Sequence, residues 1–154
     1  LSSPHVKYRP VSILIFILNW EITGNDVFYL KFTNLLIHLF CVVLVFFLSN
    51  LLLNKKFIFT KKTASLLALL LTALWLLSPY QVSTVLYVIQ RMAQLSTLFM
   101  LSGLICYVLG RNKLESSELK SGLILIAIAI LFFWPLSFFS KQNSAIFPLI
   151  LFMI

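Results

Sequence analysis

The chain has 154 residues, 61% of them hydrophobic, a mean hydropathy of +1.04 and only 10% charged residues. A soluble domain carries roughly 25% charged residues, so this composition excludes both a water-soluble fold and a disordered chain. Twelve basic and four acidic residues give a net charge of +8, and the basic residues stand between apolar runs, where they indicate membrane topology rather than nucleic-acid binding. We therefore expect an integral membrane protein whose partners include membrane lipid and exclude nucleic acid.

Residues 1–27 are expected to form an outer loop that contains one short helix. Pro10 to Trp20 is an apolar stretch with proline in its first turn, a position that suits proline. At about 1.5 Å per residue this helix would extend ~16 Å, whereas the hydrocarbon layer is about 30 Å thick. We therefore expect it to lie along the interface, with Trp20 at the level of the headgroups.

Longer apolar runs predict four full membrane helices and the start of a fifth. The third run, Val82 to Leu109, would extend ~42 Å, which predicts that it is tilted, broken or begins outside the lipid. In the fourth, Pro135 predicts a kink. The predicted helices are residues 28–53, 63–77, 82–109, 122–139 and a truncated 145–154. The expected fold class is thus all-α and polytopic transmembrane, in one domain over 1–154. Since the chain begins without Met and ends inside an apolar run, we interpret it as a fragment of a longer protein.

The connecting segments predict the orientation. Residues 54–62 carry four lysines and no acid, and residues 110–121 carry three basic residues. Two helices separate these segments, so both can face the cytoplasm, as the positive-inside rule requires. Residues 1–27, 78–81 and 140–144 are then expected on the outer side.

Arg91 is the sharpest exception to that rule, because it lies about 14 Å along its predicted helix. Arginine at membrane depth costs about 2.5–3.5 kcal/mol and usually faces a cavity or a partner. In an unbroken helix one polar stripe would include Arg91 and, at helical spacing, Ser83, Tyr87, Gln90 and Gln94. The stripe predicts either a polar cleft open to the outer face or a seam of hydrogen bonds between helices.

Arg9 and Lys141 are expected to border the same face as Arg91. Three cations at an outer interface without acidic partners favour an anion that also partitions into lipid, such as a polyprenyl-phosphate headgroup. Each alone could equally be a snorkelling anchor, which is our interpretation of Lys7 and Lys31.

The remaining polar residues have mostly structural interpretations. Asp26 is a candidate general base, although Asn-Asp before an apolar run is the stronger signal of a helix N-cap. His38 and Asn34, one turn apart, predict a hydrogen-bonding pair between helices rather than a metal site. Cys41 and Cys106 lie in apolar runs and are expected to be free thiols.

The order of several short motifs resembles the polytopic membrane glycosyltransferases of the GT-C type, in particular the TMTC-type protein O-mannosyltransferases and their bacterial relatives with tetratricopeptide repeats. Towards the N-terminus the similar residues are Tyr8-Arg9-Pro10-Val11-Ser12, Leu18-Asn19-Trp20, Gly24-Asn25-Asp26-Val27-Phe28 and Asn34-Leu35-Leu36-Ile37-His38-Leu39. Downstream they are Ser78-Pro79-Tyr80-Gln81-Val82, Val88-Ile89-Gln90-Arg91-Met92-Ala93 and Ser140-Lys141-Gln142-Asn143 with Pro148. Two positions depart from the family pattern: Ser78 replaces the usual His, and Gln142 the usual Glu.

The resemblance implies a partial GT-C fold and an enzyme that transfers a sugar, with inversion, from a polyprenyl-phosphate donor to a protein or glycan acceptor. The active side would be periplasmic, in a bacterial inner membrane. The catalytic carboxylate of the family lies in an earlier loop that this sequence does not contain, so the fragment itself is expected to be inactive, with no catalytic residue beyond the candidate Asp26. The expected substrate-binding residues are Arg9, Gln90, Arg91, Lys141, Tyr87 and Gln94, and a divalent metal cofactor is left open. Two alternatives stay open: a segment of a transporter or flippase for a lipid-linked or anionic solute, which should show inverted repeats, and a non-catalytic membrane scaffold subunit.

Overall fold

A computed structural model describes residues 9–24, 26–55 and 60–153, and every regular element in these ranges is helical. The helices are α2 (Pro10–Thr23), α3 (Val27–Lys55), α4 (Lys61–Leu76), α5 (Pro79–Leu86), α6 (Arg91–Glu115), α7 (Leu119–Ile128), α8 (Trp134–Ser140) and α9 (Phe147–Met153). Two 3₁₀ turns, Val88–Gln90 and Gln142–Ile146, and one π-helical turn, Ala129–Phe133, connect some of them. The predicted all-α class is confirmed.

Three of these helical segments are long and apolar enough to cross a membrane: Val27–Lys55, Val88–Glu115 and Leu119–Ser140. A fourth span results if α4 and α5 count as one, although they meet at a bend of 59°. Their outward surfaces keep large apolar side chains exposed, for example Leu74 at 72% and Leu131 at 76%. Such surfaces suit lipid rather than water, so the chain is a membrane protein.

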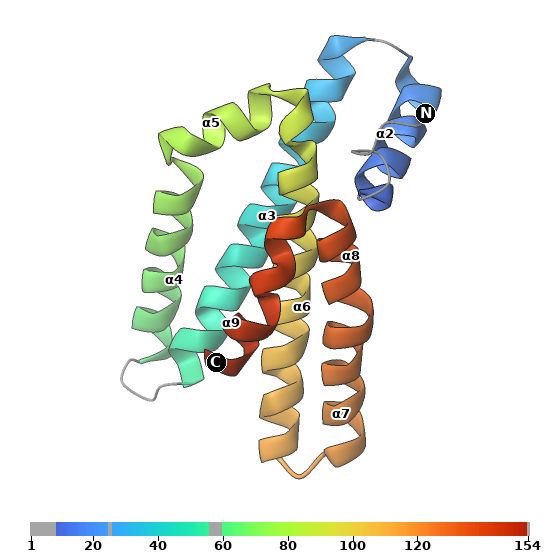
Figure 1. The fold of residues 1–154 in the computed structure, drawn as a ribbon. Helices are drawn as coiled ribbons and strands as arrows, with labels where there is room; N and C mark the ends of the chain where they lie inside the picture. The colour runs from blue at the N-terminus through green and yellow to red at the C-terminus, as the bar shows by residue number, and fades with distance from the viewer. Residues whose placement is uncertain (1–8, 25, 56–59, 154) are drawn as a thin grey trace.

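The bundle has two distinct ends (Figure 1). Helix α5 crosses one of these ends, which we call the α5 end. Helix α2 lies at the same end of the bundle. At the opposite end α3 and α6 finish together, where Lys55 Nζ donates to Glu115 Oε1 at 2.7 Å. The two lysine-rich segments expected on one side of the membrane therefore do share one end of the molecule. An exposed ion pair of this kind contributes little energy, so it reports the arrangement rather than causing it.

The third predicted helix, residues 82–109, is broken in the structure. Helix α5 ends at Leu86, Tyr87 is extended with φ −88° and ψ 114°, and α6 begins only at Arg91 after a 3₁₀ turn. The Asn34 amide donates to the carbonyls of Val85 at 3.3 Å and Tyr87 at 3.4 Å. These carbonyls lie at the end of α5, where a helix leaves acceptors without partners in a following turn, and the Tyr87 carbonyl also accepts from the Gln90 N–H at 3.0 Å. A side chain from α3 thus helps to satisfy the break.

The expected kink at Pro135 corresponds to a change of helix type just before it. The Trp134 N–H donates to the Ala129 carbonyl, which gives the π-helical turn Ala129–Phe133. Proline lacks the N–H of a regular helix and collides with the preceding turn, and a wider turn relieves that collision. The truncated last helix also differs from expectation, since Gln142–Ile146 is a 3₁₀ turn and α9 begins at Phe147.

Helix α6 is the centre of the bundle and packs against α3, α7 and α8. Its approach to α7 depends on two glycines that face each other: a Cβ on Gly110 would lie 2.9 Å from the Gly122 carbonyl oxygen, and one on Gly122 equally close to the Gly110 carbonyl oxygen. Small residues at such crossings let helix backbones approach closely in a membrane. Near the α9 segment the core is the cluster of Leu104, Phe147 and Leu151.

Candidate functional site

Arg91, the first residue of α6, is completely buried at the α5 end. Its Nε donates to Asn34 Oδ1 at 2.8 Å, and its Nη2 donates to the Leu30 carbonyl at 2.7 Å. Its Nη1 donates to Asn19 Oδ1 at 3.2 Å, and the ring of Phe16 lies 4.6 Å from its Cζ. Each guanidinium nitrogen is therefore engaged by the protein itself, and we call this arrangement the Arg91 cage.

The Arg91 cage ties together three helices, because Asn19 and Phe16 belong to α2, Leu30 and Asn34 to α3, and Arg91 to α6. A buried guanidinium needs hydrogen-bond acceptors for its N–H groups, and neutral oxygens and an aromatic face supply them here. Of the two alternatives that the sequence left open for Arg91, the structure therefore shows hydrogen bonds between helices and not an open polar cleft.

The rest of the predicted polar stripe does not form one face. Ser83 belongs to α5, and Tyr87, at the break, is 64% exposed. Gln90 is half-buried in the 3₁₀ turn, and only Gln94 shares α6 with Arg91. The spacing of an unbroken helix does not apply across the extended residue at the break, which is why these side chains separate.

Arg9 lies beside the Arg91 cage, and among the described residues its hydrogen-bond partner is a weak acceptor. It is half-buried, and its Nη1 donates to the sulfur of Met92 at 3.3 Å. A thioether is a poor acceptor, so most of the hydrogen-bonding capacity of this guanidinium is not used by that contact. Among the described residues the ion pairs are Lys55–Glu115 and Lys113–Glu118, so neither Arg9 nor Lys141 is paired with a carboxylate.

Lys141 is held at the same end by a chain of buried hydroxyls. Ser12 of α2 donates to the Ser140 carbonyl at 2.9 Å, and Lys141 follows directly as a half-buried residue. Next to it Ser137 donates to the Ser96 carbonyl at 2.8 Å, the Oγ atoms of Ser137 and Ser144 are hydrogen-bonded at 2.7 Å, and Ser144 is also bonded to Ser96. The corner between α8 and α9 is therefore fixed to α6, and the segments carrying Arg9 and Lys141 touch each other.

Asp26 caps a helix. Its Oδ1 accepts from the N–H of Phe28 at 2.9 Å at the start of α3, which confirms the N-cap interpretation. In the described part of the chain no group of three His, Cys, Asp or Glu residues could hold a metal ion. Cys41 and Cys106 are free thiols, as expected. Lys7, Tyr8 and Asn25 lie outside the described residues.

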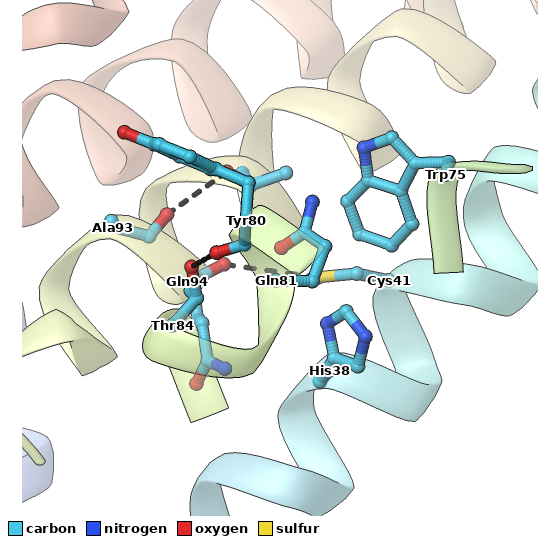
Figure 2. Close-up of a pocket in the computed structure, with 9 residues that line it drawn as sticks. His38, Cys41, Trp75, Tyr80, Gln81, Thr84, Ala93 and Gln94 are labelled. Atoms are coloured by element: carbon cyan, nitrogen blue, oxygen red, sulfur yellow. Dashed lines mark hydrogen bonds between the residues drawn. The ribbon is translucent and has the colours of Figure 1, made fainter. Parts of the chain in front are cut away.

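A cavity of about 190 Å³ lies under α5, between α3, α4 and α6 (Figure 2). Figure 2 shows His38 and Trp75 on one side of it and Thr84 and Gln94 on the other, with Gln81 between them. Of the hydrogen bonds between helices expected for Asn34 and His38, the described residues show those of Asn34 and none of His38. Instead His38 stacks on Trp75, with ring centroids 5.2 Å apart and planes at 23°, while Asn34 bonds across helices by itself.

Of the lining residues, sequence reasoning had selected only Gln94 as a binding candidate. His38 and Gln81 lie in motifs that resemble the GT-C family, and that resemblance was a sequence signal for them. Trp75 and Thr84 lie outside these motifs, and no sequence signal pointed to them. Gln94 is 3% exposed, and neither its amide nitrogen nor its amide oxygen has a hydrogen-bond partner among the described residues. A buried amide in that state costs free energy, so this side chain needs a further explanation.

Comparisons of the chain with protein-family models, with curated proteins and with solved structures found no match.

Proposed function

We propose that the chain forms the membrane core of a glycosyltransferase of the GT-C type, acting on the periplasmic side of a bacterial inner membrane. The donor would be a sugar linked to a polyprenyl phosphate and the acceptor a protein or glycan. The bond between the anomeric carbon and the phosphate oxygen would break, a bond from that carbon to the hydroxyl oxygen of the acceptor would form, and polyprenyl phosphate would leave. The proton of that hydroxyl would pass to a base or to the departing phosphate.

One observation carries the proposal: Arg9 and Lys141, 132 positions apart in sequence, belong to segments that touch at the α5 end, and within the described part of the chain neither is paired with a carboxylate. A guanidinium with unused donors and a flexible ammonium are the groups that bind phosphate oxygens in proteins. Arg9 and Lys141 both lie in motifs that resemble those of the GT-C family, which supports the lipid-linked sugar donor as the ligand. Arg91 is then a positioning residue, whose cage holds Met92 against Arg9.

A photolabelling experiment tests the phosphate site without requiring catalysis. The protein in nanodiscs is irradiated with a benzophenone-tagged polyprenyl phosphate, and labelling is competed with undecaprenyl phosphate or phosphatidylglycerol. We expect undecaprenyl phosphate to compete and the double variant Arg9→Gln, Lys141→Gln to lose at least about tenfold in affinity, ~1.4 kcal/mol.

Lys31→Gln is the matched control, since Lys31 is an exposed cation near the start of α3. Unchanged labelling in the double variant, or equal competition by phosphatidylglycerol, would reject the phosphate site and leave the scaffold alternative. In the native enzyme, release of polyprenyl phosphate with the sugar on an acceptor identifies transfer, whereas movement of the intact donor identifies a transporter.

A further inference from the structure

The cavity under α5 has a chemistry distinct from the cationic site at Arg9 and Lys141. None of the residues that line it is Lys, Arg, Asp or Glu. The polar side chains that line it include the amides of Gln81 and Gln94, the hydroxyls of Thr84 and Thr97, the imidazole of His38 and the indole of Trp75. A formally charged ligand would therefore lose its hydration without gaining a counter-charge, so the cavity suits a neutral polar molecule.

The size of the cavity further limits which neutral polar molecules it can bind. Its volume of about 190 Å³ corresponds to roughly six water molecules at ~30 Å³ each. Pockets for drug-sized ligands begin at about 300 Å³. A single six-membered ring with its substituents fits this scale.

One wall of the cavity is aromatic. His38 of α3 and Trp75 of α4 stack on each other there, so a ligand can meet only the outer face of one ring as a flat surface. The apolar C–H face of a sugar ring packs against such a surface, while its edge hydroxyls need donors and acceptors in the ring plane. The amides of Gln81 and Gln94, across from this wall, supply both kinds of group.

Gln94 is the second and independent observation. Its amide is buried beside the cavity and has no partner for either polar atom in the described structure. Rotation about its own side-chain bonds carries the amide toward the cavity, where ligand hydroxyls can both donate to it and accept from it. Binding would thus remove the penalty of an unsatisfied buried amide, which gives the ligand an advantage over an apolar occupant.

We propose that the cavity between His38, Trp75, Gln81 and Gln94 binds the ring of one neutral monosaccharide. That this monosaccharide is the sugar of the lipid-linked donor rests on the proposed function. That the cavity binds a monosaccharide ring does not depend on it.

The test measures binding through the fluorescence of Trp75 in a background with Trp20→Phe and Trp134→Phe. Trp20 is exposed, and the indole N–H of Trp134 has no hydrogen-bond partner among the described residues, so neither change removes an observed hydrogen bond. The protein in nanodiscs is titrated with the methyl glycosides of glucose, galactose, mannose and N-acetylglucosamine, and with sorbitol and inorganic phosphate. We expect at least one glycoside to change the emission saturably, and sorbitol and phosphate to leave it unchanged.

Gln94→Leu is the decisive variant, with Gln81→Leu as a second in case the first does not fold. Each should weaken glycoside binding by at least tenfold, whereas Ser102→Ala, which removes a hydroxyl of α6 away from the cavity, should bind as the parent does. Absence of a saturable change with all four glycosides, or undiminished binding in a folded Gln variant, overturns the proposal. If glycosides bind but the phosphate labelling fails, the phosphate site is rejected and the monosaccharide cavity is kept. If the phosphate labelling succeeds but no glycoside binds, the cavity proposal is rejected and the phosphate site is kept.

Discussion

Arg91 and Gln94 are both buried polar side chains in the first turn of α6, yet their surroundings are opposite. Every guanidinium nitrogen of Arg91 donates to an oxygen of a neighbouring helix, whereas neither amide atom of Gln94 has a partner in the described structure. Arg91, in a completed junction, and Gln94, an unsatisfied group beside a cavity, are three positions apart on the same helix.

The difference separates two roles that residue type and burial alone do not distinguish. A buried polar group with all its bonds made stabilises one arrangement of helices, and its removal leaves its former acceptors unpaired. A buried polar group without bonds destabilises the protein unless something binds to it. Four substitutions test this contrast, beginning with the one of largest effect.

Arg91→Leu should destabilise the protein by about 3 kcal/mol or more, because it removes the buried donor that Asn34, Asn19 and the Leu30 carbonyl share between three helices. Thermal unfolding in nanodiscs and the yield of monodisperse protein measure the loss. Arg91→Lys should recover only part of it, since an ammonium cannot reproduce the fork of the guanidinium. Lys31→Leu is the exposed control, and equal melting of Arg91→Leu and the parent would end the assignment of Arg91 to the junction.

Asn34→Leu should cost about 2 kcal/mol and should act on the break between α5 and α6. It removes an acceptor of Arg91 and the donor to the Val85 and Tyr87 carbonyls. Hydrogen exchange of the amides from Tyr87 to Gln90 should change in rate, while exchange in α7 stays as in the parent. An unaltered pattern at the break would mean that the extended residue does not depend on α3.

Ser137→Ala should cost about 1 kcal/mol, since it removes two hydrogen bonds that fix the corner between α8 and α9. Ser102→Ala is the matched control, because that hydroxyl bonds only within its own helix. The two melting temperatures are compared directly. If they coincide, the serine cluster contributes no more than ordinary helical serines.

Gln94→Leu should have the smallest effect and the opposite sign, an increase in stability of roughly 1 kcal/mol without ligand. Leucine fills similar space without a polar group to satisfy. Thermal unfolding of this variant beside the parent gives the sign. A decrease would show that the amide of Gln94 is hydrogen-bonded in the parent, and the contrast with Arg91 would then disappear.

The spans with simple local signals were predicted closely from sequence. The run 28–53 corresponds to Val27–Lys55 and the run 63–77 to Lys61–Leu76, because lysines bound both apolar stretches. The position of the two basic segments, 54–62 and 110–121, at one end of the molecule was predicted from the same local charges. The N-cap of α3 was equally local, since Asp26 bonds two residues away.

The break at Tyr87 and the burial of Arg91 could not be predicted in this way. No proline or glycine marks the break, which depends on Asn34, more than fifty positions earlier in the sequence. An arginine with polar neighbours at helical spacing has the same sequence pattern whether it faces a cleft or a neighbouring helix. Only the positions of Asn19, Leu30 and Asn34 decide between the two.

The Arg91 cage also constrains the order in which the molecule can be assembled. Its acceptors on α2 and α3 precede Arg91 by 57 to 72 positions, so the ribosome makes all of them first. Until α6 has entered the bilayer, the Leu30 carbonyl and the two asparagines lack this donor, and α2 has no arginine to dock on. We therefore expect α2 to complete its contacts only after α6 has entered the bilayer, although it is translated before every other described helix.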